Sequence, residues 1–419
     1  MLHFINNEEE SLSIKSSQEN AQQKKFWGAL LVIAGTTIGA GMLSLPMSVA
    51  ALGILGGSAL LVAMWFVMYV AALIAVDLNL HIGVGSSIAK LSNLYLGKIP
   101  GYIASIALVL MLNSLLVAYT SGASSLIQNL VTSHANITLN EHSIMIVFVI
   151  LMSALVCIDM KVLDAGNRIF FAIMIGVFIA MMIVLFPKIH ISSEMLPVQH
   201  TSFSPWFIAI PLFFTSFGFH GSIPSMVQYC KKQPLILKRA FFWGTLIPLL
   251  TYIVWMIGGL SIVYVNNPLV FELLVNGNAD LGVFVSALSQ VIDTNWLQSS
   301  SWIFSLLAII TSFLGVAIGL FDYYREHISI TSPAKKRFIS GFLALGVPLA
   351  LTLIAEKTFL KVLGFAGIFL SIIAVGLPCL IWLRLGKQKL SSSLNQQLVM
   401  LILAVGICVI VCEIYNLCF

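Results

Sequence analysis

Two glycine-rich stretches, each inside a long apolar run, hold the residues best suited to bind a small charged molecule. Residues 34–46 read AGTTIGAGMLSLP and residues 215–224 read TSFGFHGSIP. The first lies within residues 26–52, which carry no charge and are long enough to cross a bilayer as a helix. Glycine and threonine are weak helix formers, and a helix that breaks inside a membrane must bury its backbone in protein or line a polar cavity. Both stretches are therefore predicted to be helix breaks at a binding site.

The free backbone groups at such breaks match the two charges of a neutral amino acid. In the first stretch, N–H groups near Ala40, Gly41 and Met42 would begin a second half-helix and could hold a carboxylate. In the other stretch, carbonyl groups of residues 217–219 could hold an ammonium group. The alternative for each glycine taken alone is close helix packing, because several have the small-xxx-small spacing.

Two polar side chains lie inside apolar runs. His220 is the only histidine in the middle of such a run, where it could sense protons or hydrogen-bond a substrate. The alternative is a neutral imidazole that ties unwound backbone together. Asn113 faces either the cavity or a neighbouring helix. The six cysteines have no metal-ligand spacing and are interpreted as small packed side chains.

The composition predicts an all-α polytopic membrane protein around these residues. Hydrophobic residues make up 59% and charged residues 9%, whereas soluble proteins contain about 25% charged residues. Residues 1–25 are a polar tail without a signal-peptide pattern. The net charge of +5 comes from basic loops, so the expected surroundings are a lipid bilayer and not nucleic acid.

Eleven apolar segments have about the length of a membrane span. They lie at residues 26–52, 54–76, 101–133, 143–158, 169–187, 205–230, 240–265, 297–321, 338–355, 362–383 and 395–412. Residues 281–292, LGVFVSALSQVI, are too short to span and predict an amphipathic helix lying over the outer face.

The basic residues predict the orientation of these segments. If the N-terminus is cytoplasmic, all but three of the 21 Lys and Arg fall on the inner side, the exceptions being Lys188, Lys357 and Lys361. This is the asymmetry of the positive-inside rule, and the opposite orientation would invert it. With eleven spans, the end at Phe419 is then periplasmic.

The first and sixth segments predict an inverted repeat. Each has a glycine cluster followed by a proline, and they would cross the membrane in opposite directions, five helices apart. The domain organisation expected is a first five-helix repeat at residues 26–187, an inverted second repeat at 205–383, and an eleventh helix with a short outer end at 395–419.

Three motifs carry a resemblance to a known family. GTTIGAGMLSLP, TSFGFHGSIPS and TSFLGVAIGLFDY (residues 311–323) resemble the bacterial aromatic amino acid permeases of the amino acid–polyamine–organocation superfamily. The tyrosine-specific permeases are most similar in appearance, followed by the tryptophan permeases. The resemblance implies the leucine-transporter-type 5+5 fold with unwound first and sixth helices, an eleventh helix, and proton-coupled uptake across the bacterial inner membrane.

The resemblance also implies two groups of binding residues. The substrate contacts it implies are Thr37, Ala40, Gly41, Phe217, Gly218 and His220. The cation site it implies consists of carbonyls of Gly35, Ile38 and Ala308 with hydroxyls of Thr311 and Ser312, a set of five oxygens that suits a hard cation such as sodium.

The fifth span departs from the family pattern. It contains no lysine, and Met174 stands where the family usually has one whose ammonium can occupy the cation position and titrate. Either sodium fills the site, or protons act elsewhere, with His220 the first candidate. The coupling ion is therefore H⁺ or Na⁺, and no cofactor is expected.

The expected function is cation-coupled symport of an aromatic amino acid, tyrosine first, by a monomer that works by alternating access. Phe217, Phe219 and Phe313 would line the site, and Asn113 or His220 would meet a phenolic hydroxyl. The alternative substrate is another neutral amino acid: tryptophan, phenylalanine, serine or threonine. A membrane-embedded enzyme is disfavoured because only one ionisable residue lies mid-span, and a channel because no filter motif or charge ring is present.

Overall fold

The computed structural model describes residues 20, 22–156, 160–196, 203–230, 233–290, 295–354, 359–390 and 394–418. Within these ranges the chain is helical, with turns between helices and without strands. The predicted N-terminal tail, residues 1–25, lies outside the described residues apart from Asn20 and residues 22–25.

The first predicted span is broken where its glycines and threonines predict a break. A helix over Gln22–Thr37 is followed by the short 3-10 helix η1 (Ala40–Leu43) and by α2 (Ser44–Val49), and the two parts of the span are bent by 46°. The sixth span consists of α8 (Ser204–Ser216), η4 (His220–Ser222) and α9 (Ile223–Tyr229). Residues 217–219 lie between helices, so both predicted breaks are confirmed.

The remaining apolar segments also form helices close to the predicted bounds. They are α3 (Gly53–His81), α5 (Lys98–Ala135), α6 (Glu141–Val156), α7 (Met160–Leu185), α10 (Pro234–Asn266), α13 (Asn295–His327), α14 with α15 (Pro333–Gly341, Val347–Ile354), α16 with α17 (Phe359–Leu370, Leu377–Leu390) and α18 (Gln396–Cys418). In the described chain, nine helices are long and apolar enough to cross a membrane, and ten if the bent first pair counts as one. The predicted fourth span, α6, is a shorter apolar helix of 16 residues.

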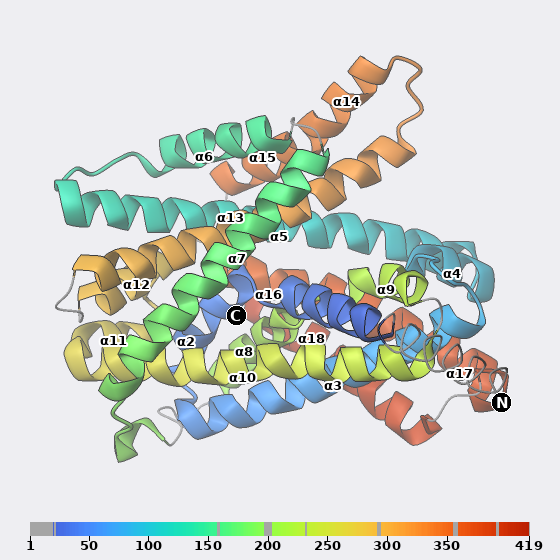
Figure 1. Ribbon diagram of the computed structural model, residues 1–419, viewed down its shortest axis with the longest axis horizontal. Helices are drawn as coiled ribbons and strands as arrows, with labels where there is room; N and C mark the ends of the chain where they lie inside the picture. The colour runs from blue at the N-terminus through green and yellow to red at the C-terminus, as the bar shows by residue number, and fades with distance from the viewer. Residues whose placement is uncertain are drawn as a thin grey trace, which may run out of the picture.

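The helices run roughly side by side along the long axis of the molecule, as Figure 1 shows, and α7 crosses α13 obliquely. α5 packs against both α13 and α16, and α8 packs against α16 and α18. η1 contacts α8 and α13, so the break of the first span lies in the middle of the bundle.

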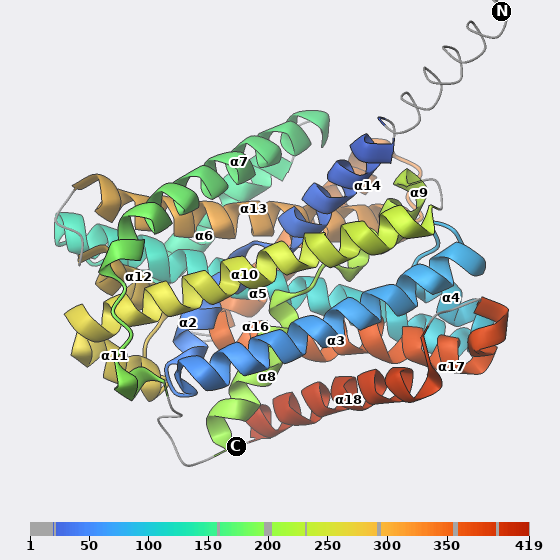
Figure 2. The same cartoon turned by 60° about the horizontal axis from the view of Figure 1, so that its bottom comes forward.

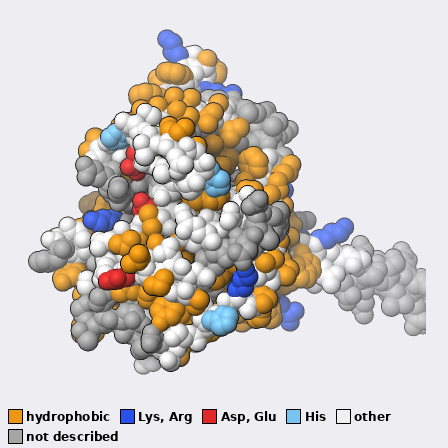
Figure 3. Space-filling view, turned by 90° about the vertical axis from the view of Figure 1, so that its left-hand side faces the viewer, with side chains coloured by type: hydrophobic (Ala, Val, Ile, Leu, Met, Phe, Trp, Pro, Cys, Tyr) orange, Lys and Arg blue, Asp and Glu red, His pale blue; other side chains and the backbone are white. Residues whose placement is uncertain are grey.

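Three short helices lie beside the spans. The segment predicted to be amphipathic is α12 (Leu281–Gln290), which lies beside α11 (Pro268–Val275) at one end of the molecule (Figure 1). Its apolar residues, including Phe284, are buried against neighbours that include α5 and α13, so it packs into the bundle end. Neither α11 nor α4 (Ile88–Tyr95) is predicted from the sequence. Figure 3 faces the α11–α12 end, where charged side chains are scattered singly.

The last span, α18, flanks the bundle beside α3 and α17, and it ends next to α8 (Figure 2). It packs onto a π-helical turn over Ser371–Gly376, between α16 and α17. The Ser371 hydroxyl donates to the Gly406 carbonyl at 2.8 Å. A side chain at Gly406 would collide with Val375, so the glycine lets α18 approach closely.

Candidate substrate and cation site

The breaks of the first and sixth spans touch each other at Gly41 and Ser216. A Cβ atom added to Gly41 would lie 3.2 Å from the Ser216 Cα, so a larger residue there would push on the backbone of α8. The Ser216 hydroxyl lies 2.9 Å from the Leu212 carbonyl and 3.2 Å from the Gly41 carbonyl, and its single proton serves both acceptors. The close approach that glycine permits is therefore used to join the two breaks.

A tyrosine from α10 connects the ends of both half-helices. The buried Tyr252 hydroxyl lies 2.6 Å from the Thr37 carbonyl and 2.9 Å from the Ser216 carbonyl, and its single proton serves both acceptors. Each carbonyl lies at the C-terminal end of a half-helix, where intrahelical partners are missing and the helix dipole is negative. The Thr37 hydroxyl donates to the Ile33 carbonyl at 2.7 Å, so only its carbonyl meets Tyr252.

One turn further along α10, Trp255 supports the second half of the first span. Its indole N–H donates to the Met42 carbonyl at 3.0 Å, and the side chain is fully buried. The N–H of Met42 donates to the Gly39 carbonyl at 3.1 Å. Backbone groups around the break are thus held from α10 as well as by local turns.

The eighth span contacts the other side of the first break. The backbone N–H of Ala40 donates to the Ser312 hydroxyl of α13 at 2.9 Å, and a Cβ atom on Gly39 would collide with that hydroxyl. In the preceding residue, the Thr311 hydroxyl donates to the Leu307 carbonyl at 2.8 Å and approaches the Ala308 carbonyl at 3.3 Å. Of the residues predicted from α13 to hold a cation, Ser312 therefore contacts the break, and the contacts given for Thr311 and Ala308 lie within α13.

The fifth span reaches the same region. A Cβ atom on Gly35 would lie 3.4 Å from the Phe171 ring of α7, and Met174, one turn further on, is fully buried. Met174 offers a thioether where a lysine would offer an ammonium group, so this helix supplies no charge at that position.

Aromatic side chains surround the sixth break. Phe217 is fully buried and its ring centroid lies 5.3 Å from that of Tyr252. Phe219 stacks on His220 at 4.6 Å. His220 is 8% exposed and its ring lies beside the backbone of Met68 on α3, yet among the described residues neither ring nitrogen has a hydrogen-bond partner of ordinary geometry.

Two predicted substrate residues have contacts that point elsewhere. Phe313 packs edge-on against Phe148 of α6 at 5.3 Å. The Asn113 amide donates to the Val109 carbonyl of its own helix at 2.8 Å, and its buried side-chain oxygen has no partner in the part of the chain that the structure describes. Their part in substrate binding stays a prediction, as does that of Gly218, whose Cβ would lie 3.0 Å from the Thr215 carbonyl.

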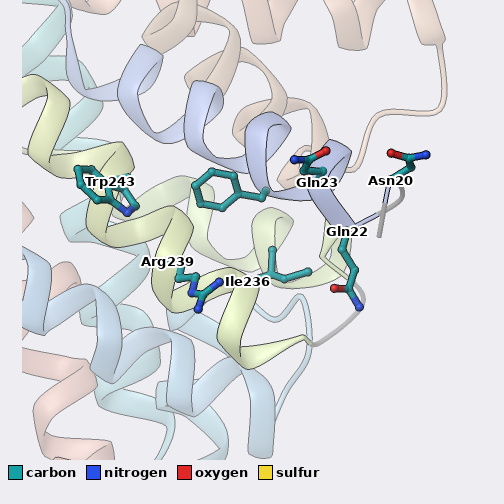
Figure 4. A pocket seen from close by; sticks show the side chains of 7 residues that line it. Asn20, Gln22, Gln23, Ile236, Arg239 and Trp243 are labelled. Carbon is teal, nitrogen blue, oxygen red and sulfur yellow. The ribbon is translucent and has the colours of Figure 1, made fainter. Parts of the chain in front are cut away.

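Two cavities open toward opposite ends of the bundle. The first, about 580 Å³, lies between the Gln22–Thr37 helix and α10, and Figure 4 shows Gln22, Arg239 and Trp243 at its walls. The second, about 530 Å³, lies among α2, α8, α11, α16 and α18; its walls include Ser48, Leu212 and Glu413, and we call it the Glu413 cavity. Both lie beside parts of the broken spans.

Three residues at the breaks, Tyr252, Trp255 and Ser216, are not predicted from the sequence as site residues. Tyr252 and Trp255 do carry a signal, because polar hydrogens in the middle of an apolar span need acceptors. Which acceptors they reach depends on helix packing, which the sequence of α10 alone does not specify.

Comparison with known proteins identifies the family. The profile of the tryptophan/tyrosine permease family matches residues 22–413, nearly the whole chain and both broken spans. The chain belongs to this family. The tyrosine-specific transport system 1 of Haemophilus influenzae is 31% identical over 85% of this chain and 88% of its own length. The tryptophan-specific transport protein of Pseudomonas aeruginosa is 28% identical over 91% of each chain. The glutamine transporter 2 of Aliivibrio fischeri is 28% identical over 87% of this chain and 90% of its own.

Membership in the tryptophan/tyrosine permease family confirms the resemblance that the three sequence motifs indicate. The protein is a multi-pass membrane permease for amino acids, and its relatives are transporters and not enzymes. At the broken first and sixth spans of this permease, backbone groups bonded to side chains of other helices lie together with buried aromatic rings and hydroxyl groups.

Proposed function

We propose that this permease imports an aromatic amino acid, tyrosine first, by cation-coupled symport across the bacterial inner membrane. The observation that carries the proposal is the meeting of two broken helices at Gly41 and Ser216, with Tyr252 joined to both. Backbone ends of this kind bind the charged groups of substrates and ions in transporters built from inverted repeats. We therefore infer the leucine-transporter-type 5+5 arrangement, with α6 as the fourth span and α18 outside the repeat.

The proposed substrate position lies beside the contact between the two breaks. Phe217 and Phe219 provide an apolar wall for a side chain, and the unpartnered His220 nitrogens are available to a polar group such as a phenolic hydroxyl. Relatives named for tyrosine and tryptophan support an aromatic substrate. The relative named for glutamine makes a neutral, amide-bearing amino acid the second candidate, because a histidine can also hydrogen-bond an amide.

The proposed cation position lies between the first break and α13. Ser312 already meets the backbone of Ala40, and Thr311 and Ala308 lie in the adjoining turn. Carbonyl and hydroxyl oxygens suit sodium, a hard cation. Since Met174 carries no titratable group, a proton would have to act at another residue, and His220 is the candidate near the breaks.

Alternating access follows from the way the breaks divide each span. The half-helices of spans one and six can change their angles to the bundle while their broken ends stay at the substrate, so the site opens to one side at a time. The N-terminus is cytoplasmic and the C-terminus periplasmic in this proposal, as the basic residues predict.

The decisive experiment is uptake of labelled tyrosine by the purified protein in liposomes, with sodium and proton gradients imposed separately. Accumulation above equilibrium with one gradient, absent from protein-free liposomes, is expected and identifies the coupling ion. Unlabelled tryptophan, phenylalanine, glutamine and serine as competitors rank the substrates. If neither gradient drives accumulation of any of these amino acids, the proposal is wrong. A His220→Gln variant that keeps the wild-type pH profile would remove His220 from the coupling.

A further inference from the structure

The Glu413 cavity has the composition of an amino acid site, although its lining does not include Gly41 or Ser216, where the two breaks meet. Its volume of about 530 Å³ falls within the range of small-molecule pockets. Apolar walls come from Leu212, Leu274 and Leu360, and charged groups from Glu413 and Lys361. An apolar wall with one carboxylate and one ammonium group matches an amino acid with an apolar side chain.

Glu413 is a buried carboxylate on α18 that no basic residue neutralises in the described part of the chain. Its side chain is 3% exposed, and the Asn416 amide donates to it at 3.2 Å. Asn416 also donates to the Phe207 carbonyl at 2.9 Å, which fixes the amide between α18 and α8. Removing a carboxylate from water is costly unless a positive group pairs with it. A bound ammonium group would supply the positive partner that a buried carboxylate at Glu413 needs.

Lys361 lies one helical turn before Gly364, the residue of α16 that packs against the Glu413 carboxylate. A Cβ atom on Gly364 would lie 2.9 Å from a Glu413 carboxylate oxygen, and residues three apart on a helix share a face. Lys361 is exposed and lines the same cavity. No ion pair joins Lys361 to Glu413 among the described residues, so both charges remain available to a ligand between them.

We infer that the Glu413 cavity is a second binding site for the transported amino acid, in which Glu413 receives the ammonium group and Lys361 the carboxylate. This inference rests on the proposed function, because it takes the ligand to be the transported zwitterion. The cavity is walled by Met47 and Ser48 of α2 and by Leu212 of α8, the half-helices that lead to the two breaks. In the proposed orientation the Glu413 cavity faces outward. It would therefore bind the substrate before the substrate reaches the proposed position beside the two breaks.

The test is equilibrium binding of labelled tyrosine to the purified full-length protein. Wild type is expected to bind two molecules per chain, and Glu413→Gln and Lys361→Gln one each. Gln at 413 keeps an acceptor for Asn416, and Lys361 is exposed, so both variants should fold. Matched controls are Glu272→Gln and Lys188→Gln, exposed residues outside the cavity lining, which should keep two.

Uptake provides a second readout. Loss of one charge-assisted hydrogen bond should raise the half-saturating tyrosine concentration about tenfold while maximal uptake is retained. Tyramine, which lacks the carboxylate, should compete less with tyrosine in Glu413→Gln than in Lys361→Gln.

Two results would overturn the inference. If wild type binds one tyrosine that Gly41→Val abolishes, and Glu413→Gln binds as wild type does, only the central site exists and the proposed function stands. If wild type binds no amino acid at all, the proposed function fails and the inference fails with it.

Discussion

At the scale of single residues, the Tyr252 hydroxyl stands where two negative helix ends converge. The carbonyls of Thr37 and Ser216 belong to different spans, and one phenolic proton serves both. A pair of carbonyls so placed could equally receive an ammonium group or a metal cation. A neutral hydroxyl in that place fixes the distance between the breaks without adding charge, which leaves the charges of the substrate and the coupling ion to the neighbouring groups.

The variant Tyr252→Phe tests this role. It removes the shared donor and leaves two buried carbonyls without it, so we expect a loss of about 1–3 kcal/mol of stability and reduced uptake. Thermal unfolding of the purified protein and initial uptake rates measure both effects. Tyr102→Phe is the matched control, because the Tyr102 side chain is 67% exposed. Equal unfolding temperatures for Tyr252→Phe and wild type would show that the hydroxyl does not hold the breaks together.

A second prediction at this scale concerns the contact between Gly41 and Ser216. Gly41→Val places carbon atoms where the α8 backbone lies 3.2 Å from the new Cβ, so we expect tyrosine binding to be abolished while the protein still inserts. Binding to purified protein and the membrane-fraction yield are the measurements. Gly176→Val in α7 is the control, since no atom lies within 4 Å of its added Cβ. Unchanged affinity in Gly41→Val would move the site away from this contact.

At the scale of elements, the two helix breaks could be predicted from the sequence, whereas the side chains that hydrogen-bond to them could not. Glycine, threonine and proline disfavour continuous helix locally, so residues 34–46 and 215–224 reveal the breaks from sequence alone. Tyr252, Ser216 and Trp255 act on backbone that lies far away in sequence, and local composition does not encode such pairings. The short helices α4 and α11 were missed for a related reason: at eight residues each, they fall below the length that a span requires.

The contact between Ser312 of α13 and Gly39 at the first break gives a prediction about how these two elements pack. Gly39 has an extended backbone (φ −167°), which any residue adopts, so Gly39→Ala should act only through the collision of its Cβ with the Ser312 hydroxyl. We expect lower stability and lost uptake. Adding Ser312→Ala removes the hydroxyl and leaves the two Cβ atoms 3.7 Å apart, an ordinary contact, so the double variant should regain stability.

Thermal unfolding of wild type, both single variants and the double variant measures this coupling as a double-mutant cycle. Ser312→Ala alone removes the acceptor of the Ala40 N–H and should cost about 1 kcal/mol. Additive effects in the cycle would mean that α13 does not pack on the break as described.

At the scale of the whole molecule, the distribution of charge and apolar surface explains why the fold needs a bilayer. Large apolar side chains such as Ile150, Ile183 and Leu351 are exposed on α6, α7 and α15. In water such a surface would drive aggregation, whereas lipid tails cover it. Basic residues gather in alternate connections between the spans, and this asymmetry predicts the orientation without reference to helix packing.

The orientation can be tested at the native Cys418, which is exposed at the end of α18. With eleven spans and a cytoplasmic N-terminus, Cys418 faces the periplasm, so a membrane-impermeant maleimide should label it in intact cells with a permeabilised outer membrane. Cys418→Ser should lose this labelling, whereas the buried cysteines and Cys408, on the lipid-covered part of α18, should react little because the reactive thiolate needs water.

Lys335→Cys, introduced into Cys418→Ser at the exposed start of α14, should react only after the inner membrane is opened. Labelling of Cys418 and Lys335→Cys from the same side would mean an even number of spans between these two positions, and would exclude either the periplasmic C-terminus or the cytoplasmic connection before α14. Because α14 with α15, α16 with α17, and α18 are all long and apolar, such a result would require one of them to re-enter the membrane without crossing it.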